Sequence, residues 1–393
     1  MATFTNNNTR VFYAMKAVAI GPIGATSIED SSTALDGSEA KCRIVHGLQS
    51  MGITTNFNLE QAFEFGQLSI YENIEEVPDV EVTMEKVLDG YSLLYHLGTP
   101  AATTPLLTGR ADSRADVRMA IVGSTEDAVT SSDSAVAELY CSGMYLSSVS
   151  YSLPTDGNFT ESVSFVGNNK KWITASTDTQ NLLVGVSNTG VVSAVFAAIF
   201  GSNSPASTNI QRRQHFIDGT TGKVLGGTTF KTYLPADIGG IAATSGGSDT
   251  VDVSTTHIQS INISTDLGRE SINHLGAKDP YNRYVSFPTE VTCEIEVIAT
   301  RGDDVTAVGS QETSQLSNRW IQIVCEDSTV MQLGIKNKLS SVNYGGGDAG
   351  GGNDTITYSY SNFNDFTILH SGDPLIGNAG YAGTYWQNHY TVV

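Results

Sequence analysis

The stretch QSMGITTNFNLEQAFEFGQLSIYENIEEVPDVEVTMEKVLDG, residues 49–90, decides the fold because it returns later in the chain. Residues 259–302 read QSINISTDLGRESINHLGAKDPYNRYVSFPTEVTCEIEVIATRG. With Gln49 placed on Gln259, the two stretches share identical residues in one constant register. A repeat of this length predicts two copies of one structural unit. The identical positions are Gln49, Ser50, Ile53, Thr55, Glu60, Gly66, Tyr71 and Pro78, which match Gln259, Ser260, Ile263, Thr265, Glu270, Gly276, Tyr281 and Pro288.

Two later blocks extend the repeat in the same order. RMAIV at 118–122 matches RWIQI at 319–323, and LSSVSY at 146–151 matches LSSVNY at 339–344. The spacing between matched blocks shrinks along the chain, which predicts shorter loops between the same elements of the second copy. The alternative is that β-rich segments with many Ser and Thr residues resemble each other by chance. Three blocks in one order favour a duplicated domain.

The clearest strands lie in the middle of each copy, at residues 79–87 and 290–298. Both segments alternate apolar and polar residues, the pattern of a strand with one buried face. After the proline of each copy the match shifts by one residue, so that VTME at 82–85 lies opposite VTCE at 291–294. The polar face is acidic in both copies, which indicates a surface with a shared role. Its carboxylates are Glu81, Glu85, Glu290, Glu294 and Glu296.

The chain is predicted to be mainly β, with two tandem β-sandwich or barrel domains that each carry a short flanking helix. Strands joined by turns, with one or two short helices, favour these architectures. In the first copy we expect a helical turn at 59–65 and a second short helix within 88–97, which Gly98 and Pro100 would end.

Five segments follow from the repeat and from shifts in composition. The connector is too long for a bare linker, so we expect it to pack on one copy or to reach a neighbouring chain. The C-terminal arm contains Tyr381, Tyr385, Trp386 and Tyr390, aromatic residues that suit contact with a partner subunit. The segments are an N-terminal arm at 1–44, the first copy at 45–173, a connector with strand-like pieces at 174–255, the second copy at 256–370 and a C-terminal arm at 371–393.

The composition limits the classes of function. Of the 393 residues, 21 are Lys or Arg and 41 are Asp or Glu, so the net charge is −20 and the surface repels nucleic acid. The longest apolar run, residues 191–200, is too short to span a bilayer. The polar start, MATFTNNNTR, lacks the apolar core of a signal peptide, which predicts assembly in a cytoplasm. The four cysteines are scattered, which predicts buried free thiols.

The sequence contains none of the common catalytic or cofactor motifs. A nucleophile elbow, an HExxH motif, a dinucleotide fingerprint and a Walker loop are all absent. The GTTGK run at 219–223 has Ile217 where a phosphate loop needs glycine and Val224 where it needs Ser or Thr. The tripeptide Arg-Gly-Asp at 301–303 falls where the first copy has its own turn. We therefore expect a protein that is not an enzyme, without cofactor or metal, although an unfamiliar active site stays open as an alternative.

Residues 47–91, and LSSVSYSLPTDGNFTESVSFVGNNKKW at 146–172, resemble the tail tube proteins of long-tailed bacteriophages. The resemblance covers most of the first copy and, more weakly, the second. It implies a β-sandwich or barrel-like domain with a flanking helix, six such domains in a ring, and stacked rings that conduct phage DNA. Most such proteins carry one domain and form hexamers. Two domains in one chain imply trimeric rings with pseudo-sixfold symmetry instead.

The resemblance also implies roles for the residues named above. The carboxylates of Glu81, Glu85, Glu290, Glu294 and Glu296 are expected to face the lumen and to repel DNA, which passes without specific binding. The expected partners are further copies of the chain and other tail proteins, namely a terminator, a baseplate or tip protein and the tape measure during assembly. No membrane is expected, and the location is the virion tail after assembly in the host cytoplasm.

Two alternatives stay open. The first is a trimeric baseplate hub or tail-completion protein, which would cap a tube and not polymerise. The second is a virion decoration or receptor-binding protein, for which the aromatic C-terminus and the Arg-Gly-Asp tripeptide would be the contact sites.

Overall fold

The structure is a computed structural model. The residues that it describes are 15–25, 27–29, 41–66, 68–102, 104–122, 135–174, 210–225, 227–239, 241, 256–277, 280–300, 302, 318–346 and 353–371. Over these residues the chain is mainly β, as predicted, with short helices α1 (Leu94–Leu97) and α2 (Leu107–Arg110) in the first copy. The corresponding place in the second copy falls largely within residues 303–317, outside the described residues.

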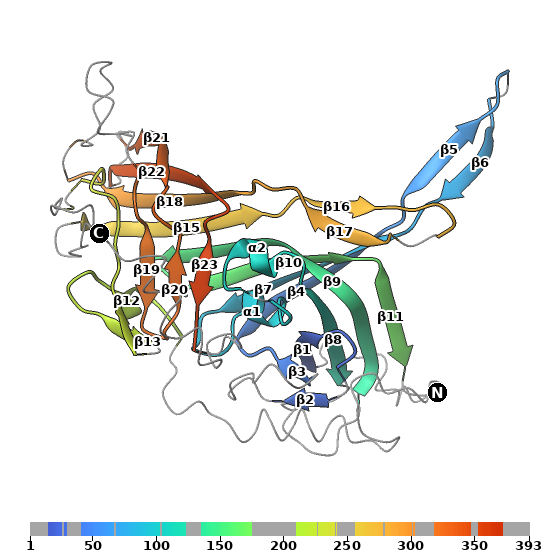
Figure 1. The fold of residues 1–393 in the computed structure, drawn as a ribbon, viewed down its shortest axis with the longest axis horizontal. Helices are drawn as coiled ribbons and strands as arrows, with labels where there is room; N and C mark the ends of the chain where they lie inside the picture. The colour runs from blue at the N-terminus through green and yellow to red at the C-terminus, as the bar shows by residue number, and fades with distance from the viewer. Residues whose placement is uncertain are drawn as a thin grey trace, which may run out of the picture.

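A central antiparallel sheet runs through both copies (Figure 1). Its first four strands come from the first copy and its last four from the second. Each segment alternates side chains between a buried and an exposed face, which is why it forms a strand with one face on the core. The order is β4 (Leu48–Asn56), β7 (Asp79–Val87), β10 (Thr160–Gly167), β9 (Ala135–Pro154), β15 (Ile258–Asp266), β18 (Glu290–Ile298), β22 (Thr355–Phe363) and β21 (Lys338–Gly345).

Each copy adds a second group of strands. In the first copy, β8 (Arg114–Val122) pairs with β1 (Met15–Pro22) and with the first half of β9, which also pairs with β11 (Asn169–Thr174). β3 (Lys41–Ile44) pairs with β1, and β2 (Ser27–Glu29) pairs with β3. The described part of the predicted N-terminal arm is therefore part of a sheet.

The second copy repeats this group in a shorter form, to which the connector adds the first strand. The order is β12 (Phe216–Ile217) of the connector, then β19 (Gln322–Cys325), β20 (Val330–Gln332) and β23 (Thr367–Leu369). The long β9 of the first copy corresponds here to two separate strands, β20 and β21. Gly143 within β9 and Gly334 between β20 and β21 both have positive φ angles, which glycine adopts without strain. These glycines allow the chain to bend from one strand group into the other.

Each copy carries a hairpin at the same place. β5 (Leu59–Phe63) pairs with β6 (Ile70–Glu75), and β16 (Arg269–Ile272) pairs with β17 (Asn282–Val285). The predicted helical turn at 59–65 is therefore wrong, because pairing with β6 overrides the local preference of this segment. In Figure 1 the β5–β6 hairpin projects away from the body of the molecule, whereas β16–β17 lies along it.

The described part of the connector packs on the second copy. β12 pairs with β19, Arg319 forms an ion pair with Asp237, and a small hairpin of β13 (Lys223–Leu225) and β14 (Thr228–Phe230) follows. The backbone N–H of Gln211 also donates to the carbonyl of Leu88 in the first copy, at 2.8 Å. The connector thus ties the two copies together.

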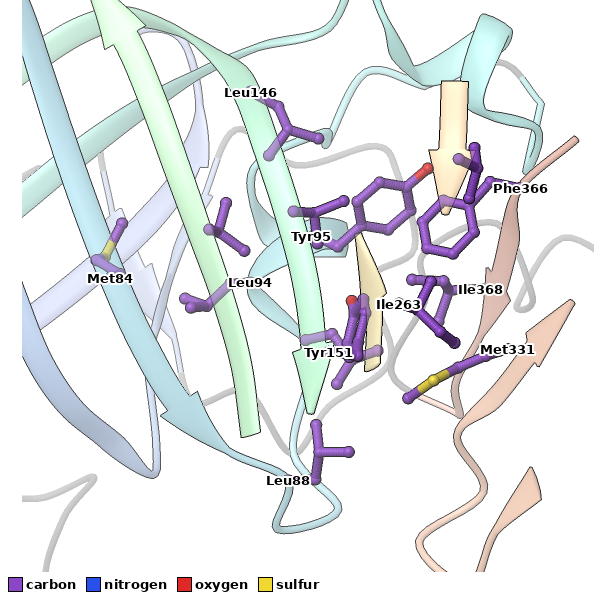
Figure 2. Packing of buried hydrophobic residues seen from close by; sticks show 14 of the residues in the cluster. Met84, Leu88, Leu94, Tyr95, Leu146, Tyr151, Ile263, Met331, Phe366 and Ile368 are labelled. Carbon is purple, nitrogen blue, oxygen red and sulfur yellow. The ribbon is translucent and has the colours of Figure 1, made fainter. Parts of the chain in front are cut away.

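One hydrophobic core serves both copies. Figure 2 shows Leu94 and Tyr151 of the first copy in the same cluster as Ile263, Met331 and Phe366 of the second. A unit of roughly 120 residues is long enough to bury a core of its own. The shared core instead makes the two copies one packed body.

The cysteines are buried free thiols, as predicted. Burial raises the pKa of the Cys42 thiol to about 11 and that of Cys141 to about 12, and it also raises those of Cys293 and Cys325. A protonated, buried thiol is a poor nucleophile, so these side chains serve as small apolar core residues.

Candidate assembly edges and acidic face

The central strands of the two copies correspond residue by residue. The pairs β4–β7 and β15–β18 each have an irregularity just before a serine, Ser50 in one and Ser260 in the other. The pairs β9–β10 and β21–β22 each have one beside a leucine, Leu146 and Leu339 respectively. Bulges are defined features of a strand pair, so they anchor the equivalence of the two copies.

This equivalence corrects one detail of the sequence match. The sequence placed Glu85 on Glu294, but Ser50 pairs with Glu85 while Ser260 pairs with Glu296. Glu85 therefore corresponds to Glu296, two residues further along. Because side chains alternate with a period of two, this shift leaves the carboxylates on the same face of the sheet.

All five predicted carboxylates lie on the exposed face of the central sheet. Glu81, Glu85, Glu290 and Glu294 are exposed and Glu296 is half-buried, whereas the alternate residues of β7 and β18 point into the core. The strands between them contribute small hydroxyl side chains, and one row across the sheet consists of Glu85, Ser162, Ser150, Ser264, Thr292 and Ser361.

Serine hydroxyls hold three of these carboxylates in place. Ser164 donates to Glu81 at 2.9 Å, Ser260 donates to Glu296 at 3.2 Å, and Ser50 lies 3.5 Å from Glu85. The last two contacts join equivalent residues of the two copies. The face therefore presents fixed negative charges among neutral hydroxyls, with Lys338 at the start of the edge strand β21. Fixed negative charges attract cations and repel phosphates.

The two copies meet at a joint between β9 and β15. Residues 148–154 of β9 pair antiparallel with 260–266 of β15, with Ser150 opposite Ser264. Because β9 also pairs with β10, this joint makes the two sheets continuous.

The β16–β17 hairpin adds side-chain contacts across the same joint. Arg283 forms an ion pair with Asp79, Tyr145 donates a hydrogen bond to Asn282, and Arg269 donates to the carbonyl of Leu146 at 2.8 Å. The joint therefore has two parts, a strand pair and a hairpin clamp.

The two ends of the central sheet are open edges. Over the described part of the chain, β4 pairs only with β7 and β21 only with β22. By the equivalence above, β4 corresponds to β15 and β21 corresponds to β9. The chain thus presents at its edges the same two strand types that it joins internally, and an open edge is a template for pairing with another chain.

A buried carboxylate that sequence reasoning missed positions helix α1. Glu161 on β10 accepts hydrogen bonds from the backbone N–H groups of Leu94 and Tyr95, at 2.7 and 3.0 Å, and from the hydroxyl of Tyr151 at 2.6 Å. Burial raises the pKa of this carboxyl. The sequence contains a sign of this burial, because the alternation along β10 puts Glu161 on the same face as the buried Val163 and Phe165.

Two of the predicted contact sites fall in parts of the chain that the structure does not describe. The aromatic residues Tyr381, Tyr385, Trp386 and Tyr390 lie outside the described residues, and so do Arg301 and Asp303. Among the described residues, no group of three or more His, Cys, Asp or Glu side chains is arranged to hold a metal ion. No helix in the described ranges has the length and apolar character needed to cross a membrane.

Comparisons with known proteins give structural neighbours only. No family model matches the chain, and no curated protein does. Matches among solved structures include the anti-feeding prophage baseplate, with 10% identity, 41% of this chain and 93% of the other covered, and a TM-score of 0.28. The cap that terminates the anti-feeding prophage tube matches with 11% identity and a TM-score of 0.26, over 40% of this chain and 88% of the other. A chain from the virion of a native gene transfer agent matches with 10% identity and a TM-score of 0.20, over 40% of this chain and 98% of the other.

These neighbours are components of phage-type particles. Each is covered nearly whole by about two fifths of this chain. At such identities and TM-scores the likeness carries no argument about function, which has to come from the residues of this chain.

Proposed function

We propose that this chain is the structural subunit of a phage tail tube, in which three copies close into a ring with pseudo-sixfold symmetry. One observation carries the proposal. Two equivalent four-strand units lie side by side in one sheet, and the outer edges β4 and β21 are of the same types as the strands that meet in the middle. A surface that is complementary to itself in this head-to-tail sense generates a closed ring or an open filament. The repeated pairing order also supports an internal duplication.

The acidic face supports the assignment of the lumen. The opposite face of the sheet is covered by α1 and by core side chains, so the carboxylate face is the one left for the inside of a ring. Fixed carboxylates repel DNA phosphates and hydroxyls offer no cation to bind them, so DNA would slide without sticking. In this proposal Glu81, Glu85, Glu290, Glu294 and Glu296 line the conduit.

The proposed partners follow from this role. Further copies of the chain form the ring and the stack of rings, and other tail proteins contact the two ends of the tube. The location is the virion tail, and the role is structural, without catalysis or a cofactor.

Negative-stain electron microscopy of the purified protein, with mass determination of the smallest ring, tests the proposal. Long hollow tubes built from rings of three chains are the expected result. Discrete trimers that never stack would favour a baseplate hub instead. A protein that stays monomeric at all concentrations would contradict ring formation, and binding to host-cell glycans would then favour a receptor-binding role.

A further inference from the structure

We infer that the joint between two chains repeats the joint inside one chain, with β21 of one chain paired with β4 of a second copy and Asn343 opposite Thr54. This inference rests on the proposed function and deepens it, since it gives the register of the contact. The partner is a second copy of this chain.

The register comes from the bulges. Inside the chain, Ser150 of β9 lies opposite Ser264 of β15. When the two copies are aligned by their bulges, Thr54 is equivalent to Ser264 and Asn343 is equivalent to Ser150. The same mapping gives the remaining pairs, which are Gly52 with Gly345, Ile53 with Tyr344, Thr55 with Val342 and Asn56 with Ser341.

Burial supports this pairing, because the open edges expose residues whose equivalents are buried at the internal joint. Ile263 and Tyr151 face each other there and are each 1% exposed. Their equivalents at the open edges are Ile53, which is half-buried, and Tyr344, which is 62% exposed. Pairing of β21 with β4 would remove this apolar surface from water, which stabilises the joint.

The side chains also fit by face. Thr54 and Asn343 are both exposed and lie on the carboxylate face, while Ile53 and Val342 pack against the core cluster. A register displaced by one residue would put apolar side chains opposite polar ones along the whole edge. The proposed register keeps one face polar and the other apolar across the joint.

The hairpin clamp has an equivalent with complementary charges. The strand pairs β5–β6 and β16–β17 match in register, so Glu72 corresponds to Asn282. Tyr145, the partner of Asn282, corresponds to Lys338 at the start of β21. The hydrogen bond inside the chain is thus replaced between chains by the oppositely charged pair Glu72 and Lys338.

The ion pair between Arg283 and Asp79 also has a polar equivalent between chains. Arg283 corresponds to Asn73, and its partner Asp79 corresponds to Glu290. The side-chain amide of Asn73 can donate to the carboxylate of Glu290. Two of the three clamp contacts therefore find suitable partners on the second copy. The third does not, because Leu59 takes the place of Arg269, which donates to the carbonyl of Leu146 inside the chain.

Engineered disulfides test the register directly. Residues opposite each other in an antiparallel pair have Cα atoms about 4.5–5.5 Å apart, within the range that a disulfide spans. The double variant T54C/N343C is assembled under reducing conditions, checked for rings by electron microscopy, then oxidised and separated on a non-reducing denaturing gel. The expected product is a covalent species of three chains, which reduction returns to single chains. The native cysteines are buried and give no background.

Two matched variants serve as controls. S150C/S264C carries the equivalent pair of the internal joint and should form a disulfide within one chain. S50C/S341C is six residues out of register, about 20 Å along the strand, and should stay unlinked.

The outcomes separate the register from the proposed function. Rings that form while T54C/N343C stays unlinked and S150C/S264C links would overturn the register but not the ring. Linkage of S50C/S341C would also overturn it. If wild-type protein forms no rings, the proposed function fails. Should T54C/N343C itself not assemble, the charge pair of Glu72 and Lys338 tests the same joint in a chain without new cysteines.

Discussion

Glu161 lies under the first turn of α1 with no exposure to solvent, on a strand face otherwise occupied by apolar side chains. It stays there because α1 has no side-chain cap, so the backbone N–H groups of Leu94 and Tyr95 need an acceptor from elsewhere. The carboxylate meets this need and fastens the helix to β10.

Replacing this carboxylate tests its role. In E161Q the amide group cannot accept from both N–H groups and from Tyr151, which leaves a buried donor unsatisfied. We expect the free energy of unfolding to fall by about 1–3 kcal/mol, measured by denaturant unfolding monitored by circular dichroism. The exposed E85Q serves as the control and should change stability little.

The pH dependence of the same variant has a definite sign. Burial raises the pKa of Glu161 above its ordinary value of 4.5, so the folded chain keeps the proton where the unfolded chain releases it. The stability from Glu161 is complete below pH 4.5 and decreases as the pH rises through the folded pKa. The advantage of wild type over E161Q should therefore shrink as the pH rises above 4.5. An advantage that grew with pH would contradict this account.

At the scale of elements, the sequence predicted best what depends on local pattern. The segments 79–87 and 290–298 form β7 and β18 with the predicted bounds, because alternation of apolar and polar residues is itself the cause of a half-buried strand. The prediction of a helical turn at 59–65 was wrong because this segment pairs with β6, which lies beyond the next loop. The joint between β9 and β15 could not be predicted, since β9 and β15 are separated by the whole connector.

The clamp between chains gives a prediction at the same scale. E72K and K338E each place like charges opposite each other in the proposed joint, so either variant should raise the concentration needed for ring formation. An exposed pair contributes little, so we expect an increase of about two- to fivefold for each. Analytical ultracentrifugation over a range of concentrations measures it.

The double variant E72K/K338E restores the attraction with the charges exchanged. Recovery towards wild-type assembly would support the contact, and additive defects in the double variant would argue against it. High salt should reduce all of these differences.

At the scale of the whole molecule, the β5–β6 and β16–β17 hairpins both end in an exposed apolar residue. Phe65 and Leu275 occupy equivalent positions and are both fully exposed. The internal joint does not cover Leu275, so a joint of the same kind between chains would not cover Phe65. Apolar tips repeated around a ring suit contact with the next ring.

Acidic tips should therefore block stacking but not ring closure. We expect F65E/L275E to give single rings where wild type gives tubes, as seen by electron microscopy and sedimentation. V224E changes an exposed apolar residue on β13, away from the β5–β6 and β16–β17 hairpins (Figure 1), and is the control. Tubes of normal length from F65E/L275E would show that other surfaces hold the rings together.

The charge of the proposed lumen can be reversed. Tubes of E81K/E85K/E294K/E296K should retain short duplex DNA in a filter-binding assay at low salt, whereas wild-type tubes should not. Retention should fall at least tenfold between about 50 and 200 mM salt, because binding to phosphates releases counterions. DNA binding by wild-type tubes would contradict a repelling lumen.

The β9–β15 joint also limits how many domains a ring can contain. Joining separate molecules costs translational and rotational freedom at each contact, but here every second contact forms within one chain, where its two sides are held at high effective concentration. Because domains enter the ring only in pairs, a ring with an odd number of them would leave half a chain outside. Rings of five or seven domains, which differ from six by only one domain, are therefore excluded by the covalent link between the two copies. The exclusion does not depend on the exact angle between neighbouring domains.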